Sequence, residues 1–564
     1  MRAEPLGGVL PNVYINQDRL LWLIVLGGAV IIRLMELGSR PLDPDEARMA
    51  MDAFRGLGFG RQWASPEAAS PGYVGLISVL FFWFGSSDAA ARLVSAVAGI
   101  TVVALTWFTS SLLGSRSALG VAALLAASPI LIESSRSALS SSTLGCVLFM
   151  FVLAGAHVLA ALVKTATPPQ GWSIVLGASF AAGLATDATF ALQILGLGAA
   201  AIFAFDVNIL RLRFSEARRM GWSPVVLGFV LTMGLYTTRF LTNPGGIQSG
   251  LVDALWVWSG DFLQPGRIPL VPVSLLIGSE PLVLVCALAG AIRVSRGTAL
   301  ERFSAAWAAI AFGIAVVSGR GESRFLVPAI IPGALVGGPW LARLTTLPIW
   351  RERPAYIVAA AAAAPLIAAF VASLPALRNS TPPALPILLA GLAGLAGSVI
   401  GAYALVGRQA TLYGCLAMVL GFAGLGTILS SSRLAAASES DLGRITSGFV
   451  FTPDFREVEN QLAIWEWDQD RRTISVDERL KGPLGWALRS NRSVRWTPPE
   501  DIRGGLAIKL ASTRADTLPD GGLRVTVGYR TTAFAELTPI RLAEWSFWRR
   551  SVFRVEPYDI LLFR

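Results

Sequence analysis

Three carboxylates stand close together near the N-terminus, in the segment Pro41-Leu42-Asp43-Pro44-Asp45-Glu46-Ala47-Arg48. The segment follows directly on residues 20–37, an apolar run long enough to span a bilayer. Charged groups at a membrane are costly unless they face water or a partner, so these acids are candidates for chemistry. Asp43 before Pro44 also fits a helix N-cap, and capping alone is the open alternative. Both roles are compatible, because Asp43 can cap while Asp45 and Glu46 react.

The composition identifies the class of protein. The chain has 564 residues, of which 54% are hydrophobic and 15% charged, and its mean hydropathy is +0.59. Apolar runs of membrane-spanning length recur through the first 430 positions without the alternation of barrel strands, which predicts a polytopic helical membrane protein. The net charge of +10 comes almost entirely from arginine and lies largely in short loops, so no nucleic-acid partner is expected. The three cysteines fall inside apolar runs and form no disulfide or zinc motif.

The basic loops predict an orientation. Arginine and lysine favour cytoplasmic loops, and placing the basic connections inside gives about thirteen alternating spans with the C-terminal tail outside. The expected spans are residues 20–37, 92–112, 117–133, 142–163, 172–187, 188–205, 222–240, 269–291, 303–318, 325–342, 355–376, 384–406 and 411–431. We expect an all-α transmembrane domain over residues 1–431 and a multi-pass protein of the plasma membrane.

The loops that carry most of the remaining polar residues share the outer side in this arrangement. They are residues 38–91, the turn Glu133 to Arg136, residues 241–268 and the turn Ser318 to Arg324. Residues 72–84 are apolar but too short to cross a bilayer, because a helix of that length reaches only about 20 Å. We therefore expect a helix lying at the outer surface and ending near Gly85, within a juxtamembrane region at about 41–85.

The composition changes after about residue 431. Residues 439–564 mix charged residues with short apolar runs, which predicts a small extracytoplasmic α/β domain. Helices are expected at Asp454 to Asp470 and Pro483 to Arg489, and the pattern contains no GxGxxG or Walker motif. Strands are expected at Thr473 to Val476, Leu506 to Ala511, Leu523 to Tyr529 and Ile560 to Phe563.

Several of these features together resemble the GT-C superfamily of membrane glycosyltransferases, which includes the protein O-mannosyltransferases and the aminoarabinose transferases of lipid A. Residues 41–55 look like the acidic motif of the first outer loop in that superfamily. The pattern of a proline, then Phe-Gly, then Ala-Arg-Leu follows at Pro71, Phe84-Gly85 and Ala91-Arg92-Leu93. The resemblance implies a juxtamembrane helix before Gly85, in agreement with the charge-based placement.

A narrower resemblance is to a GT-C-like family of flippase activity-associated proteins found in glycosylation loci. Ile277-Gly278-Ser279-Glu280-Pro281-Leu282 is similar to its Tyr-Glu-Pro-Leu segment. Gly321 to Pro328 and Gly482 to Arg489 resemble two further motifs of that family. Many relatives carry an aspartate near position 141 and a lysine near 187, whereas this chain has Ser141 and Asp187. Many also carry Lys-Pro-Pro or His-Gly-Pro where this chain has Ala69-Ser70-Pro71.

The resemblance implies transfer of a sugar from a polyprenyl phosphate to an extracytoplasmic glycan, lipid or protein, with inversion. Such a reaction needs a base for the acceptor hydroxyl and positive charge for the leaving phosphate. Asp45 and Glu46 are the candidate catalytic residues, and a divalent metal ion is an open alternative. The candidate phosphate ligands are Arg92, Arg136, Arg320 and Arg324. The auxiliary acids are Asp43, Glu133, Glu280 and Glu322.

Two other functions stay open. The departures at Ser141 and Asp187 favour a non-catalytic membrane subunit that assists the export or flipping of lipid-linked glycans. A transporter is the weaker alternative, because no internal repeat or pair of broken helices is evident in the sequence. The arrangement of the outer acids discriminates between an enzyme and a scaffold: an enzyme needs an accessible carboxylate, whereas a scaffold can hold its acids in ion pairs.

Overall fold

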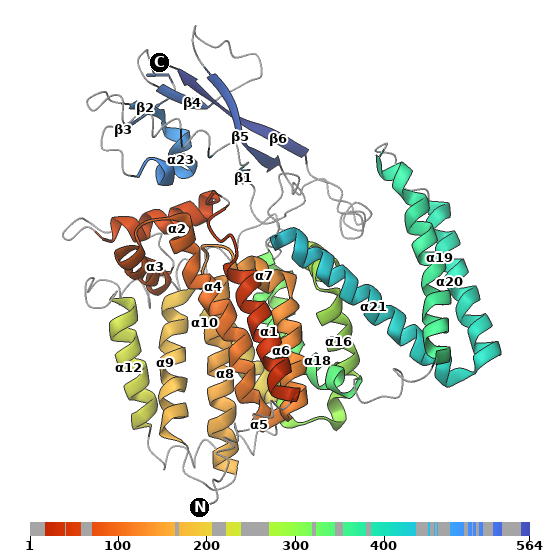
Figure 1. Ribbon diagram of the computed structural model, residues 1–564. Helices are drawn as coiled ribbons and strands as arrows, with labels where there is room; N and C mark the ends of the chain where they lie inside the picture. Colours follow the sequence, from red (N-terminus) through yellow and green to blue (C-terminus); the bar gives the residue numbers. More distant parts are fainter. Residues whose placement is uncertain are drawn as a thin grey trace, which may run out of the picture.

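The computed structural model shows a helical bundle with a sheet beyond one of its ends (Figure 1). The residues that the structure describes are 17–39, 41–57, 70–163, 169–205, 222–238, 270–318, 323–344, 353–378, 385–435, 449–451, 456, 460, 474–489, 494–498, 500–502, 507–510, 523–532 and 554–563.

The first half of the bundle is built from the helices between Gln17 and Thr237. They are α1 (Gln17–Leu34), α4 (Asp88–Leu105), η1 (Thr106–Thr109), α5 (Ser110–Leu113), α6 (Ser115–Ala127), α7 (Pro129–Ser135), α8 (Ser141–Val163), α9 (Gln170–Thr186), α10 (Phe190–Ala204) and α12 (Ser223–Thr237). Leu124, Leu125 and Phe149 are among the side chains buried between these helices and α18 (Val327–Leu344).

The second half continues from α15 to α21. Its elements are α15 (Leu270–Ser279), α16 (Pro281–Ala291), η3 (Val294–Arg296), α17 (Ala299–Ser318), η4 (Ser323–Leu326), α18, α19 (Arg353–Arg378), α20 (Leu385–Val406) and α21 (Arg408–Ala435). The most apolar stretch of α18 is 83% buried, whereas that of α21 is only 22% buried, so α18 is central and α21 peripheral. In Figure 1, α19 and α20 stand to one side, and α21 connects them to the bundle.

Every expected span coincides with one helix or with two or three consecutive helices. Five helices of the described residues are long and apolar enough to cross a membrane, and a bent pair, α6 with α7, makes a possible sixth. The remaining helices do not meet this criterion over their described residues, so the count of thirteen stays a prediction. The polytopic, all-α character of the domain is confirmed.

Two short helices lie across one end of the bundle. They are α2 (Pro44–Arg55) and α3 (Pro71–Phe84), which Figure 1 shows between the bundle and the sheet. The expected helix over residues 72–84 and its end at Gly85 are confirmed, with Gly85 at a φ of 78°. Gly72 has a packing reason to lack a side chain, because a Cβ there would lie 2.2 Å from the ring of Tyr236. This close contact seats the start of α3 on α12.

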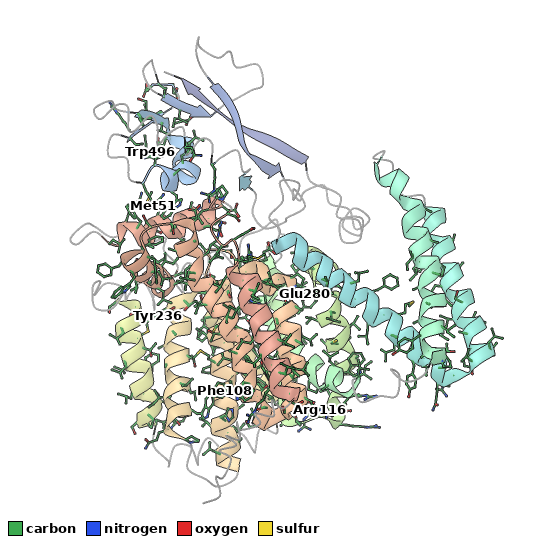
Figure 2. All side chains as sticks on the ribbon, viewed as in Figure 1. Met51, Phe108, Arg116, Tyr236, Glu280 and Trp496 are labelled. Atoms are coloured by element: carbon green, nitrogen blue, oxygen red, sulfur yellow. The ribbon has the colours of Figure 1, made fainter. Side chains whose placement is uncertain are left out.

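The described parts of two loops that are expected to share a side, residues 38–91 and the turn Glu133 to Arg136, meet at this end, where Arg136 contacts the end of α1 and Ala138 contacts Glu46. Figure 2 shows Met51, Tyr236 and Glu280 at the end next to the sheet, and Phe108 and Arg116 towards the opposite end. Loop 241–268 lies outside the described residues.

The C-terminal part forms a sheet with one short helix packed beside it. The sheet order is β1-β5-β6-β4-β2-β3, with β2 parallel to β3 and β4 and the other pairs antiparallel. The elements are β1 (Phe449–Phe451), β2 (Ile474–Asp477), η6 (Glu478–Leu480), α23 (Lys481–Ala487), β3 (Val494–Thr497), β4 (Ala507–Leu510), β5 (Leu523–Thr532) and β6 (Arg554–Phe563). The four expected strands and the helix near Pro483 are present, whereas β1 and β3 were not expected. The expected helix at 454–470 lies largely outside the described residues.

Candidate active site

Helix α2 begins where the sequence predicts. Asp43 is its N-cap in extended backbone, and Pro44 occupies the first turn, where the missing N–H costs nothing. The backbone N–H of Asp43 donates to Glu46 Oε2 at 2.9 Å, which is one half of a capping box. The local sequence therefore fixes the direction in which α2 leaves the end of α1.

Glu46 is held on all sides by protein donors. Its Oε2 lies 2.6 Å from Arg92 Nη2, and its Oε1 lies 3.2 Å from Arg92 Nε, so the pair is bidentate. The backbone N–H of Ala138 also donates to Oε1, at 2.7 Å. Both side chains are only 1% exposed. Breaking such a pair leaves an uncompensated buried charge, so the pair fixes α2 to α4 and to the segment after α7.

Arg92 is enclosed as completely as its partner. Besides the pair with Glu46, its Nη1 donates to Leu37 O at 3.1 Å and its Nη2 to Pro41 O at 2.8 Å. A phosphate could reach this guanidinium only by displacing protein acceptors. The geometry therefore favours a role for Arg92 in positioning the loop between α1 and α2.

Asp45 stands one residue before Glu46 and has a different environment. Its side chain is 38% exposed, and its Oδ1 lies 3.6 Å from Nη2 of Arg48, which is itself 68% exposed. Such a loose, solvent-exposed ion pair contributes at most about 1 kcal/mol. Of the two candidate catalytic carboxylates, Asp45 is thus the one that an acceptor molecule can reach.

The turn after α7 carries Glu133 and Arg136. Arg136 Nη1 donates to Ile32 O at 2.8 Å and to Met35 O at 2.6 Å, so it caps the C-terminal end of α1. Glu133 is half-buried on α7. Arg136 thus contributes to the joining of α1 and α7 beside the start of α2.

Two of the positions where this chain departs from the GT-C-like pattern, Ser141 and Asp187, lie close together. Ser140 Oγ, next to Ser141, donates to Asp187 Oδ2 at 2.6 Å. Asp187 Oδ1 accepts from the backbone N–H and the hydroxyl of Thr189, at 2.9 and 2.7 Å. An acid is therefore present between these two segments, but it comes from the turn after α9.

Glu280 lies deeper in the bundle, between α15 and α16. It is fully buried, and its Oε1 accepts from Ser128 Oγ at 2.5 Å and from the backbone N–H of Ile130 at 2.7 Å. Arg320 and Glu322 lie outside the described residues, and of Arg324 the structure describes only the backbone, in η4. Among the described residues, no group of three or more His, Cys, Asp or Glu could hold a metal ion.

The C-terminal domain contacts the same end of the bundle through α23 and the residues that follow it. Trp486 is 3% exposed, stacks on Phe81 of α3 at 5.5 Å, and donates from Nε1 to Asp88 Oδ1 at 2.8 Å. The guanidinium of Arg489 lies over the Trp486 ring at 3.9 Å and donates to Ser86 O at 2.8 Å. The motif Gly482 to Arg489 therefore attaches the tail domain to the turn between α3 and α4.

A second arginine strengthens this contact. Arg456 forms an ion pair with Asp88 at 3.1 Å and donates to the backbone oxygen of Ser39 at 3.3 Å. Asp88 is thus shared by Trp486 and Arg456. No sequence motif points to a contact of Asp88. By sequence it is only an acidic residue in the first turn of α4, where a negative charge favours the helix.

Replacing Trp486 by alanine should loosen the tail domain. The change removes the stack on Phe81, the hydrogen bond to Asp88 and the ring below Arg489, and truncating a buried tryptophan costs about 3–5 kcal/mol. We expect faster amide hydrogen exchange in the turn Ser86–Asp88 and in α23. Trp496→Ala is the matched control, because Trp496 lies on β3 away from the bundle (Figure 2). Equal exchange in both variants at Ser86–Asp88 would show that the contact does not hold the domain.

Comparisons with solved structures identify the architecture. ArnT from Cupriavidus metallidurans bound to undecaprenyl phosphate aligns with a TM-score of 0.53 at 18% identity, covering 83% of this chain and 84% of that one. Apo ArnT from the same organism aligns at 0.51 and 16% identity, covering 96% and 97%. The archaeal oligosaccharyltransferase AglB from Archaeoglobus fulgidus, with an inhibitory peptide and a dolichol-phosphate, aligns at 0.50 and 11% identity, covering 85% and 64%.

At these identities the likeness concerns the fold alone. No protein-family model matches the sequence, and a comparison with curated proteins finds no match either. The similar structures all belong to GT-C membrane glycosyltransferases, and the alignments extend over both the bundle and the tail of this chain. The acidic first loop, the helices across the bundle end and these alignments agree: the chain is a polytopic membrane protein with a GT-C-like fold.

Proposed function

We propose that the chain is a membrane glycosyltransferase that takes its sugar from a polyprenyl phosphate. The observation that carries the proposal is that Asp45 is accessible and stands next to Glu46, whose buried ion pair with Arg92 fixes the start of α2. A reacting group held by rigid neighbours is what efficient transfer requires. The structures of ArnT with undecaprenyl phosphate and of AglB with a dolichol-phosphate support the choice of donor class.

In the proposed reaction Asp45 acts as the general base. It accepts the proton of the acceptor hydroxyl while the acceptor oxygen bonds to the anomeric carbon of the sugar. The bond from that carbon to the phosphate oxygen breaks on the opposite face, and polyprenyl phosphate leaves with the bonding electrons. Attack on the opposite face inverts the anomeric configuration. Glu46 is proposed to position Asp45 rather than to take a proton, because it accepts hydrogen bonds from Arg92 and from the backbone N–H groups of Asp43 and Ala138.

The negative charge of the leaving phosphate needs a cationic partner. Arg92 and Arg136 donate to backbone carbonyls at the C-terminal end of α1 and in the segment that follows it, so we propose that they position the site. The phosphate role is assigned to Arg320 and Arg324, which come between α17 and α18 in the sequence.

A second candidate is a non-catalytic subunit for the export or flipping of lipid-linked glycans. The observation that favours it is the Glu46–Arg92 pair, in which one of the outer acids is fully engaged. A subunit of this kind would bind the lipid but would not consume a sugar donor. Turnover therefore separates the two candidates, whereas lipid binding is common to both.

Polyprenyl phosphate should stabilise the purified protein. A ligand that binds only the folded state stabilises it by RT ln(1 + [L]/Kd), so about 100-fold excess over Kd adds about 2.7 kcal/mol and raises the Tm. We expect the rise with undecaprenyl phosphate in mixed micelles and none with undecaprenol, which has the same chain without the phosphate. An equal shift from both lipids would contradict recognition of a phosphate.

The site is proposed to face the extracytoplasmic side, because Arg116, which belongs to one of the basic connections, lies at the other end of the bundle (Figure 2). In a variant whose three cysteines are replaced by alanine, Arg495→Cys should react with an impermeant maleimide in intact cells. Arg116→Cys should react only after permeabilisation, since Arg116 lies at the opposite end of the bundle (Figure 2). The reverse pattern would overturn the orientation.

A further inference from the structure

One helix of the bundle is broken close to the candidate active site. Helices α6 and α7 meet at Ser128 with a bend of 62°. Pro129 has no N–H, so the last carbonyls of α6 and the first amides of α7 lack the partners that a continuous helix provides. Inside a membrane protein such groups must find partners within the protein. We call this break the elbow.

Arg33 donates hydrogen bonds to the last carbonyls of α6, on one side of the elbow. It comes from α1, is fully buried, and donates from Nη2 to Leu125 O at 3.1 Å and from Nη1 to Ala126 O at 3.4 Å. Its Nε also donates to Ser135 Oγ on α7, at 3.3 Å. Among the described residues it forms no salt bridge, so its positive charge faces the negative end of α6. Arg33 therefore touches both arms of the elbow.

Glu280 accepts hydrogen bonds on the other side of the elbow, at the start of α7. Its Oε1 accepts from the Ser128 hydroxyl at 2.5 Å and from the Ile130 N–H at 2.7 Å, so one oxygen holds the first turn of α7. Its other oxygen, Oε2, is buried and has no hydrogen-bond partner among the described residues. Arg33 and Glu280 thus hold the broken helix from opposite sides, Arg33 as a donor to the last carbonyls of α6 and Glu280 as an acceptor from the start of α7.

The elbow directs the segment that contacts Glu46. After α7, Arg136 caps α1, and two residues later the N–H of Ala138 donates to Glu46 Oε1. Ser140 then bonds to Asp187 at the end of α9. A change in the angle between α6 and α7 would move this segment and, through Ala138 and Glu46, the start of α2 where Asp45 stands.

We propose that Arg33 and Glu280 are positioning residues, which hold the elbow and thereby place the carboxylate of Asp45. This role rests on the proposed function for its catalytic consequence, but its structural consequence does not. Replacing Glu280 by alanine removes the acceptor of Ser128 and Ile130. Replacing it by glutamine keeps an oxygen in that place, and no hydrogen bond of Oε2 is lost. Glu280→Gln should therefore rescue what Glu280→Ala loses.

The direct test is a distance across the elbow. Spin labels at Arg48 on α2 and at Arg116 on α6, in the variant without native cysteines, report how α2 sits relative to α6. We expect a broadened or shifted distance distribution in Glu280→Ala and the parent distribution in Glu280→Gln. Glu301→Ala is the matched control, because Glu301 also accepts a helix-start N–H, from Thr298 at 2.6 Å, but in α17 at a different connection.

Activity gives the second readout. Displacement of a reacting group by about 1 Å can cost about a hundredfold in rate, so kcat should fall by that order in Glu280→Ala while the donor KM changes little. An unchanged distance in folded Glu280→Ala, or a change in Glu280→Gln as large as in Glu280→Ala, would overturn the positioning role. If Glu280→Ala does not fold, Ser128→Ala removes one donor and should shift the distance in the same direction; an unchanged distance there would overturn the role. Absence of turnover in the parent protein would contradict the proposed function and leave the distance test valid.

Discussion

Asp45→Asn should abolish most of the sugar transfer while leaving the protein folded. The amide cannot accept a proton from the acceptor hydroxyl, and loss of a general base costs about 10²–10⁴-fold in kcat. Asp45 is 38% exposed and its ion pair with Arg48 is loose, so the free energy of unfolding should change by less than about 0.5 kcal/mol. The measurement is the initial rate of polyprenyl-phosphate release with a saturating donor, beside a thermal melt of the same preparation.

Arg48→Gln is the control for this change. It removes the same ion pair but leaves the Asp45 carboxylate in place, so its rate should stay within a few-fold of the parent rate. The two variants therefore separate the loss of a base from the loss of a surface contact. Full activity of Asp45→Asn, or an equal loss in both variants, would remove Asp45 from the catalytic assignment.

Glu46→Gln should destabilise the protein more than any other single change in the first loop. Removing one member of a buried ion pair leaves the other charge without compensation, which costs about 3–5 kcal/mol. Arg92→Met should cost a similar amount, because the buried carboxylate of Glu46 would lose its guanidinium partner. The free energy of unfolding in mixed micelles, followed by tryptophan fluorescence in denaturant, measures both.

The double variant Glu46→Gln/Arg92→Met makes the test sharper. Because both charges are gone, its loss of stability should be smaller than the sum of the two single losses, with a coupling energy of about 0.5–3 kcal/mol. Glu133→Gln, in the neighbouring α7, serves as a matched change of a half-buried acid outside the pair. Strict additivity of the two losses would show that the pair is not an energetic unit.

The fold could be predicted from local patterns where those patterns are strong. Apolar runs placed each expected span on a helix, and Asp43-Pro44 and Gly85 marked a helix start and a helix end that the structure contains. The break at Ser128 had a signal in Pro129, but an apolar run of this length reads as one span. Strands β1 and β3 are three and four residues long, too short for a periodicity to stand out.

The site was harder to predict, because its contacts join residues far apart in the chain. The bond between Glu46 and Arg92 spans 46 positions, and that between Ser128 and Glu280 spans 152. By residue type alone, Asp45 and Glu46 are equal candidates for the catalytic base. Only their surroundings in the structure separate the accessible acid from the enclosed one. A signal was available for Arg33, since a lone charge inside an apolar run points to a specific partner.

The central claim is that this protein consumes a polyprenyl-phosphate sugar. The most direct measurement incubates the purified protein in lipid nanodiscs with a panel of radiolabelled undecaprenyl-phosphate sugars and a membrane extract as the source of acceptors. We expect that one donor is consumed, that undecaprenyl phosphate is released in equal amount, and that Asp45→Asn prevents both. If all donors remain intact while the protein still binds undecaprenyl phosphate, this result would contradict the proposed glycosyltransferase activity and favour the non-catalytic subunit.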